Sequence, residues 1–226
     1  MGSNFSKEDC FHFPTMDTRN LDTLRDYLCN YSPPEGCVDC INILLFGMVG
    51  AGKSSTINTF LSALDPRGAS TTCVPTGAGP YIFTPELLSF NPDSDISSYP
   101  VIPENVIHGV AFIFDINIMD VISDDRMEEF QELQTIVAQK YVHRVVIGTK
   151  FELLQIPEIH NAWIYEFKPL QQKFEWLAER TGMDRRSMFV ISNYWRGEQI
   201  EMIKCILALY VLDNMVRNID RFFRAV

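Results

Sequence analysis

The sequence predicts an α/β fold in which a mostly parallel sheet lies between two layers of helices. Short apolar runs of strand length alternate with longer segments whose apolar residues recur every three or four positions, which is typical of parallel strands joined by helical crossovers. The first run is followed directly by a glycine-rich turn and then by a helical segment. In addition, 226 residues that are 46% hydrophobic and 21% charged are enough to bury one substantial core.

The first forty residues form a lead-in to this domain. Apolar residues within it recur at helical spacing and predict a short helix: Leu21, Leu24, Tyr27 and Leu28. The sequence SPPEG ends that helix, because proline cannot continue it and pushes the preceding residue towards extended geometry. We therefore predict a lead-in over residues 1–40 and the α/β domain over residues 41–226.

The domain begins with an apolar run, Ile41 to Phe46, which suits a strand buried on both faces of a parallel sheet. A helix is predicted from about Lys53 to Leu64. The character then changes, because six of the twelve prolines fall between Pro75 and Pro103 among Ser, Thr, Asp and Gly. We predict an irregular insert over about residues 70–103.

The second half of the chain supplies three more strands and three more helices. The predicted strands are the apolar runs at residues 109–115, 143–149 and 187–192. The first helix of this half has one side marked by Met127, Phe130, Gln134, Val137 and Tyr141. A helical region follows at about residues 161–181. The chain ends in a long helix marked by Ile200, Ile203, Leu207, Val211, Met215, Ile219 and Phe222.

The turn after the first strand reads GMVGAGKSS, and residues 47–54 fit the pattern G-x-x-x-x-G-K-[ST] between a strand and a helix. In this pattern backbone N–H groups wrap around an anion, and the helix N-terminus adds a favourable dipole. Lys53 is expected to pair with the β- and γ-phosphates, and the Ser54 hydroxyl to ligate Mg²⁺. The sequence therefore predicts a three-layer, P-loop NTPase-like fold. Its predicted phosphate site consists of Gly47, Met48, Val49, Gly50, Ala51, Gly52, Lys53, Ser54 and Ser55.

The phosphate loop does not identify the base, because the same cradle suits ATP and GTP. Ligands of open α/β sheets lie at the carboxyl ends of the strands, where the sequence GTKFE closes a predicted strand. GTPases have N/T-K-x-D at this point, and the Asp accepts hydrogen bonds from guanine. Thr149 and Lys150 match, and Glu152, one methylene longer, stands in the Asp position. A strand end that carries a lysine by chance is the alternative. Asn193, after the last strand, is a further candidate beside the base, and a plain loop is the alternative there.

Several stretches together resemble the interferon-induced protein 44 family of GTPase-like proteins. In order, they are INILLFGMVGAGKSS, VIHGVAFIFDIN, VVIGTK and MFVISNYW, followed by the long C-terminal helix. The resemblance covers roughly residues 20–224. It implies a domain that binds GTP or GDP with Mg²⁺, in a cytoplasmic protein connected with interferon and antiviral responses.

The interval before the strand at residues 109–115 departs from that family. GTPases place two further strands, a switch threonine and a D-x-x-G-like segment there. The D-x-x-G of this chain, Asp65 to Gly68, comes where the first helix ends, and we interpret it as a helix stop. We therefore expect the usual second and third strands to be missing or replaced by a Pro-rich loop, and any GTP hydrolysis to be very slow or absent.

Loss of those strands would leave the strand at residues 41–46 as an apolar sheet edge. Residues near 81–90, or a second copy of the chain in a homodimer, could cover it. Asp115, at the end of an apolar strand, is a candidate metal ligand.

The N-terminus and the composition bear on location. MGSNFSK fits the pattern for N-myristoylation at Gly2, with Cys10 as a second acylation candidate; a coincidental start is the alternative. A formal charge of −10 argues against a nucleic-acid-binding surface.

Neither of the longest apolar stretches reaches the roughly 20 residues of a membrane span. Six scattered cysteines suit the reducing cytosol. We predict a cytoplasmic protein, with membrane association through the N-terminal lipid as an extension.

Three functions remain open on these grounds. The first is a cytosolic guanine-nucleotide-binding protein with weak or no hydrolysis. The second is a non-catalytic interaction protein in which the phosphate loop is structural. The third is an ATP-using P-loop enzyme such as a small kinase.

Overall fold

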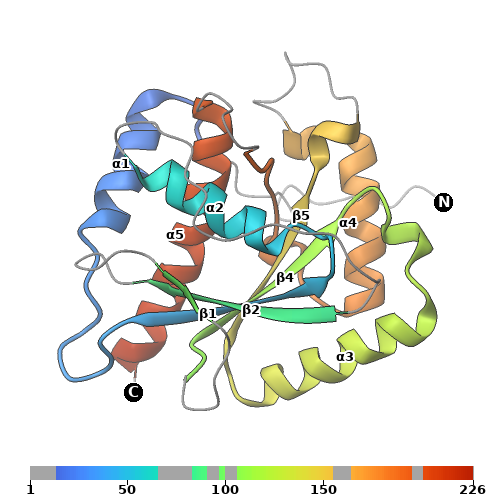
Figure 1. The fold of residues 1–226 in the computed structure, drawn as a ribbon, viewed down its shortest axis with the longest axis horizontal. Coiled ribbons are helices and arrows are strands. Elements are labelled where there is room, and N and C mark those ends of the chain that lie inside the picture. Colours follow the sequence, from blue (N-terminus) through green and yellow to red (C-terminus); the bar gives the residue numbers. More distant parts are fainter. Residues whose placement is uncertain are drawn as a thin grey trace.

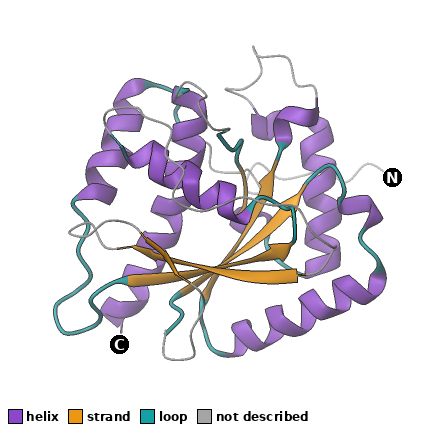
Figure 2. Ribbon diagram, viewed as in Figure 1, coloured by secondary structure: helices purple, strands orange, loops and turns teal. Residues whose placement is uncertain are grey.

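The computed structural model shows one sheet with helices on both faces (Figure 1, Figure 2). It describes residues 14–65, 83–90, 97–99, 106–154, 164–194 and 201–225. The sheet has six strands in the order β3-β2-β1-β4-β5-β6. Four of them run parallel: β1 (Ile41–Met48), β4 (Gly109–Asp115), β5 (His143–Thr149) and β6 (Met188–Val190). The predicted α/β class with a mostly parallel sheet is confirmed.

The Pro-rich interval corrects part of that prediction. Two strands lie within it, β2 (Phe83–Phe90) and β3 (Ser97–Tyr99). β2 runs antiparallel to β1 along its whole length, from Ile41 opposite Phe90 to Met48 opposite Phe83. Strands are therefore not missing here, although the strand beside β1 is antiparallel. Composition pointed to loop because proline is rare in sheets, but pairing with the exposed edge of β1 outweighs that preference. Pro85 lies outside the part of β2 that pairs with β3 and so occupies an edge position, where proline is tolerated.

The pairing of β2 with β1 also settles which segment covers the β1 edge. Of the two predicted covers, the nearby segment of the same chain is confirmed over residues 83–90. A homodimer through an uncovered β1 stays a prediction, and its premise is not met in this structure.

Two helical layers cover the sheet (Figure 1). One layer contains α1 (Thr18–Cys29), α2 (Lys53–Leu64) and α5 (Met202–Ala225), which contact one another. The other contains α3 (Asp124–Gln139) and α4 (Lys168–Thr181). Aromatic contacts seal both faces: the ring of Phe112 in β4 lies 4.6 Å from that of Phe130 in α3, and the ring of Phe189 in β6 lies 5.8 Å from that of Tyr210 in α5.

The helix patterns read from the sequence agree with the buried faces, with exceptions at the helix ends. In α5 the predicted residues Leu207, Val211, Met215 and Ile219 are buried, whereas Phe222 is half-exposed near its end. In α3 the pattern holds for Met127, Phe130 and Val137. Tyr141 does not continue it, because the helix ends at Gln139 and the tyrosine side chain is exposed.

The lead-in packs on the same core as the rest of the chain. Leu24 and Leu28 of α1 are buried, and the guanidinium of Arg217 in α5 lies 3.7 Å from the ring centre of Tyr27. The Tyr31 hydroxyl donates to Asp220 at 3.3 Å. Within the described ranges, none of the helices combines the length and apolar character needed to cross a membrane.

Candidate functional site

The predicted phosphate loop connects β1 to α2 at the carboxyl edge of the sheet. Gly47 is the last residue but one of β1, and a Cβ atom there would overlap the backbone oxygen of Ile113 in β4. Gly52 is the N-cap of α2 and has φ 101°, a left-handed conformation that side chains disfavour. A turn between them is closed by the Ala51 amide, which donates to Met48 O at 3.1 Å. The glycines are thus needed for the close approach of β1 to β4 and for the entry into the helix.

Lys53 begins α2, and its side chain turns back across the loop. The residue is only 4% exposed, and its Nζ donates to Gly47 O and to Met48 O, each at 3.1 Å. A buried ammonium needs such acceptors, because burial without hydrogen bonds is costly. Ser54 and Ser55 follow in the first turn of α2 and are half-buried. The ammonium of Lys53 therefore lies against the carbonyl groups at the end of β1, next to the first turn of α2.

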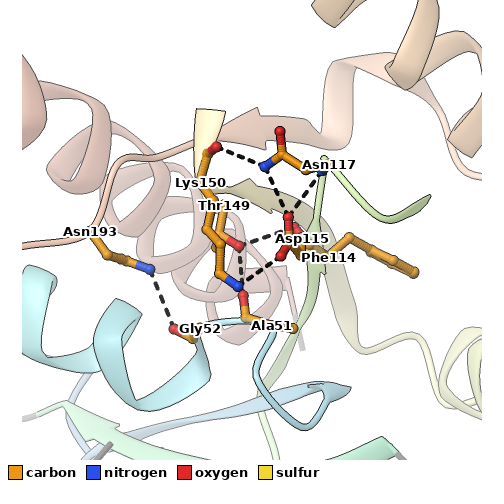
Figure 3. Close-up of polar contacts among 8 residues, drawn as sticks. All are labelled: Ala51, Gly52, Phe114, Asp115, Asn117, Thr149, Lys150 and Asn193. Atoms are coloured by element: carbon orange, nitrogen blue, oxygen red, sulfur yellow. Dashed lines mark hydrogen bonds and ion pairs between the residues drawn. The ribbon is translucent and has the colours of Figure 1, made fainter. Parts of the chain in front are cut away.

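Two residues at the ends of other strands are hydrogen-bonded to this loop (Figure 3). The Thr149 hydroxyl, at the end of β5, donates to Ala51 O at 2.6 Å, with Phe114 O as a second acceptor at 3.2 Å. Asn193, just beyond β6, donates from Nδ2 to Gly52 O at 3.5 Å. The structure thus brings together the predicted phosphate loop and two of the residues predicted to lie near the base.

Asn193 is itself held by a side chain of α2. The Thr59 hydroxyl has two acceptors within reach, Ser55 O at 2.8 Å and Asn193 Oδ1 at 3.0 Å, and it accepts from the Tyr194 amide at 3.1 Å. Thr59 was not among the predicted site residues. From the sequence alone, a helical threonine that hydrogen-bonds a distant connection cannot be told apart from one that is simply packed in the core.

The side chain of Lys150 is bound by Asp115, the last residue of the neighbouring strand β4 (Figure 3). Its backbone has φ 61°, and its Nζ lies 2.7 Å from Oδ2 of Asp115, which is buried at the end of β4. The amide and the side-chain Nδ2 of Asn117 both donate to the other oxygen, Asp115 Oδ1, at 3.0 Å. Asn117 Nδ2 also lies 3.0 Å from Lys150 O. The three side chains form one closed network.

This network bears on the metal prediction for Asp115. Because an ammonium and an amide occupy both of its oxygens, the geometry favours a counter-ion for Lys150 over a metal ligand. Across the described ranges, no group of three or more His, Cys, Asp or Glu side chains is placed to hold a metal ion. Asn117 was missed, although the sequence DIN directly after a strand is a turn signal of the kind that Asx side chains make.

Glu152 is less closely integrated than its neighbours. It lies in the short 3-10 helix η3 (Phe151–Leu154), where Phe151 is buried and Glu152 is exposed. Its carboxylate has no hydrogen bond or ion pair with any described residue. The structure therefore places Glu152 at the surface shortly after the end of β5, without fixing its carboxylate.

An apolar cavity of about 310 Å³ adjoins the phosphate loop. It is lined by Met48, Ile118, Val121, Ile122, Ser123 and Arg126. Its walls are thus the end of β1 and the connection from β4 to α3.

Some predicted features lie outside the described residues. Gly2 and Cys10 are among them, as are residues 66–68 of the D-x-x-G sequence. Asp65 is described: it is the C-cap of α2, in agreement with a helix stop.

Comparison with known proteins adds one relative. No protein-family model matches the chain, and no solved structure matches it. The chain is similar to interferon-induced protein 44 of the mouse. The two are 22% identical over 255 residues, which cover 89% of this chain and 59% of the mouse protein. The chain thus spans about three-fifths of the length of that relative. This similarity supports relatedness to that protein, in keeping with the resemblance of the motifs.

Proposed function

We propose that this protein binds a guanine nucleotide with Mg²⁺ at the phosphate loop and hydrolyses GTP very slowly or not at all. One observation carries the proposal: Thr149 and Asn193, at the carboxyl ends of β5 and β6, are hydrogen-bonded to Ala51 and Gly52. A phosphate cradle attached to the strand ends where a base would lie is the arrangement that nucleotide-binding α/β proteins use.

The chemistry expected of each residue follows from its position. Lys53 would exchange the two loop carbonyls for phosphate oxygens, and Ser54 in the first helical turn would ligate Mg²⁺. Loop amides and the N-terminus of α2 would supply further donors to the phosphates.

Choice of base rests on the segment after β5. A carboxylate there can accept from the two N–H groups on one edge of guanine, whereas adenine presents a different pattern. Glu152 stands in the sequence position of that carboxylate and is exposed, so its longer side chain would approach a base from solvent. Lys150, held by Asp115, would line the base with its aliphatic stem.

We expect slow hydrolysis because the strands beside β1 supply no segment that would position the attacking water. The antiparallel β2 pairs with β1 there, and neither β2 nor β3 contains a D-x-x-G sequence. Without a group that orients water at the γ-phosphate, the barrier stays several kcal/mol higher than in an assisted GTPase.

The biological setting is proposed from the relative. The mouse protein is named for its induction by interferon, and we propose a related, antiviral setting for this chain, in the cytoplasm. Membrane association through a lipid at Gly2, with Cys10 as a second site, is a further proposal for the same protein.

A second function is favoured by one specific observation. Both site ammonium groups already have protein acceptors, Lys53 on loop carbonyls and Lys150 on Asp115. A loop satisfied in this way could serve as structure alone, in a protein that acts by binding other proteins.

Thermal unfolding with Mg·GTP, Mg·GDP and Mg·ATP separates these functions. At a thousand times its Kd, a ligand adds about 4 kcal/mol of stability, so a guanine nucleotide should raise the Tm clearly. Lys53→Ala should abolish the rise. Lys173→Ala, which removes a half-buried lysine of α4 paired with Asp120, is the matched control and should retain it. No rise with any nucleotide would leave the structural loop as the better account, and a larger rise with ATP would point to an ATP-using enzyme.

A further inference from the structure

A second cavity lies at the opposite edge of the sheet from the phosphate loop. It has a volume of about 510 Å³. It is lined by the end of α3, the start of β5 and the connection from α4 to β6, and its lining includes Gln134, Tyr141, Arg144, Asp184 and Ser187. Because β1 and β5 run in the same direction, the start of β5 is remote from the loop that follows β1. The cavity is therefore separate from the proposed nucleotide site.

Arg144 contributes the guanidinium of this cavity. Six described arginines form ion pairs with carboxylates, namely Arg126, Arg180, Arg185, Arg186, Arg217 and Arg224. Among the described arginines without such a pair, Arg25 donates twice to Ala63 O, whereas Arg144 lines a cavity. Arg144 is half-buried, yet across the described ranges no carboxylate lies within 4 Å of its guanidinium. Its side chain makes one long hydrogen bond, from Nη1 to Gln134 O at 3.4 Å. A guanidinium has five N–H donors, so most of them are available to a ligand.

The carboxylate in the cavity wall does not balance this charge. Asp184 accepts four hydrogen bonds from Arg186, at 2.7 to 3.2 Å, through its backbone amide and guanidinium. These bonds lower the pKa of Asp184 and occupy both oxygens. In a protein with a formal charge of −10, a half-buried guanidinium that faces a cavity without a counter-ion is suited to a ligand anion.

Tyr141 adds an aromatic surface to the mouth of the cavity. Its side chain is 83% exposed, and its backbone has φ 57°, a left-handed conformation in which glycine or asparagine is usual after a helix. The ring therefore gains little from packing within the chain, and its backbone conformation is unfavourable for a tyrosine. An exposed, strained aromatic residue beside a cavity is suited to stacking on a planar ligand.

We propose that this cavity binds a small anion carried on a planar aromatic group, with the anion on Arg144 and the ring against Tyr141. Ser187 and Gln134 line the same cavity and offer further donors. The proposal is independent of nucleotide binding at the phosphate loop.

Titration of the full chain with four probes tests this site. The probes are phenyl phosphate and benzoate, which combine charge and ring, inorganic phosphate, which has charge alone, and phenol, which has the ring alone. The titrations use the Lys53→Ala variant, because the phosphate loop could otherwise bind the phosphate probes. Phenyl phosphate or benzoate should shift the ¹H–¹⁵N signals of residues 138–144 and 182–187, and should bind more tightly than either single-feature probe.

Substitutions assign the two contacts. Arg144→Gln should weaken phenyl phosphate binding by about tenfold or more, and Arg144→Lys should restore part of it. Tyr141→Asn removes the ring but keeps a residue that tolerates a positive φ, and should reduce the affinity to that of inorganic phosphate. Arg224→Gln, an exposed and paired arginine on α5, is the control and should change nothing.

Three outcomes would overturn the proposal. They are no binding of either charged aromatic probe at about 10 mM, signal shifts confined to other parts of the chain, and an affinity that survives Arg144→Gln. Circular dichroism of each variant shows whether it is folded. Because the titrations lack a working phosphate loop, their result does not depend on whether the wild-type protein binds GTP.

Discussion

The two edges of the sheet differ in how their cationic side chains are bound. At the carboxyl edge, Lys53 is bound by Gly47 O and Met48 O, and Lys150 by Asp115. At the amino edge, Arg144 faces a cavity and, within the described part of the chain, has no carboxylate partner. A ligand at the carboxyl edge must therefore compete with contacts already made inside the protein, whereas a ligand at the amino edge would supply a missing charge. At the carboxyl edge, the internal contacts hold the loop in shape before any ligand binds. At the amino edge, the charge of Arg144 would be balanced only when an anion binds.

The largest expected effect concerns packing at the carboxyl edge. Gly47→Ala would drive a Cβ atom into the backbone of Ile113, so we expect a loss of more than about 3 kcal/mol in the free energy of unfolding. Gly182→Ala at the amino edge is the matched change. A Cβ there meets nothing within 4 Å, and only its φ of +67° is unfavourable, so about 1 kcal/mol is expected. Urea denaturation measures both, and equal losses would contradict the difference in packing.

The next largest effect concerns ion pairing, and it compares Lys150, which is paired with Asp115, with Arg144. Asp115→Asn leaves the ammonium of Lys150 without its carboxylate, and we expect a loss of about 2 kcal/mol, because Lys150 is partly exposed and can reorient towards water. Arg144→Gln breaks no ion pair and should change stability by less than about 0.5 kcal/mol. Denaturation curves of the two variants give the comparison, and a larger loss from Arg144→Gln would mean that an internal partner holds Arg144.

A smaller effect tests the link between β5 and the phosphate loop. Thr149→Val removes the hydrogen bond to Ala51 O and leaves that oxygen buried, which should cost about 1 to 1.5 kcal/mol of stability. Affinity for guanine nucleotide should fall as well, because the loop loses its attachment. Thr181→Val removes a hydrogen bond to Leu177 O within α4 and is the control. The control should lower stability without lowering nucleotide affinity. If its nucleotide affinity fell as well, the loss seen in Thr149→Val could not be attributed to the hydrogen bond with the loop.

The smallest expected effect is on pH dependence. The two described histidines, His108 and His143, lie at or beside the amino ends of β4 and β5, and burial lowers the pKa of each. The unfolded chain therefore binds protons more readily than the folded protein, so stability should decrease as the pH falls below about 6.5. His108 also accepts a hydrogen bond from the Asn42 amide through Nδ1 at 2.9 Å. His108→Asn should flatten the dependence of Tm on pH between about 7 and 5, and an unchanged slope would contradict this.

The parts of the fold that the sequence could predict are those with strong local signals. Residues 109–114 carry no polar side chain, and together with Asp115 they are completely buried as β4. The glycine pattern at residues 47–54 predicted a turn between a strand and a helix, and β1 and α2 flank it as expected; phosphate binding by this turn stays a prediction. Residues near 81–90 were predicted only as one of two possible covers of the β1 edge, because their proline and polar residues show no alternation, and it is the pairing with β1 that makes this segment a strand.

In the candidate site too, residues with a local sequence signal could be predicted, whereas contacts between distant residues could not. Thr149 and Asn193 were identified from their places after strands, and the structure brings both to the loop. The partner of Lys150 was not foreseen, because Asp115 is 35 residues away in sequence and meets it only where β4 and β5 align in register. Arg144 and Tyr141 were not singled out either, since an arginine without a counter-ion can be recognised only when its neighbours in space are known.

The Thr59 hydroxyl has a mechanical consequence. It accepts the amide proton of Tyr194, a residue outside any helix or strand, and ties the connection after β6 to the middle of α2. That amide should exchange with deuterium as slowly as the amides of the central strands, although it belongs to an irregular connection. Any rearrangement of the loop must then either preserve this link, so that α2 and the connection after β6 move as one rigid unit, or break it and expose Tyr194 to solvent.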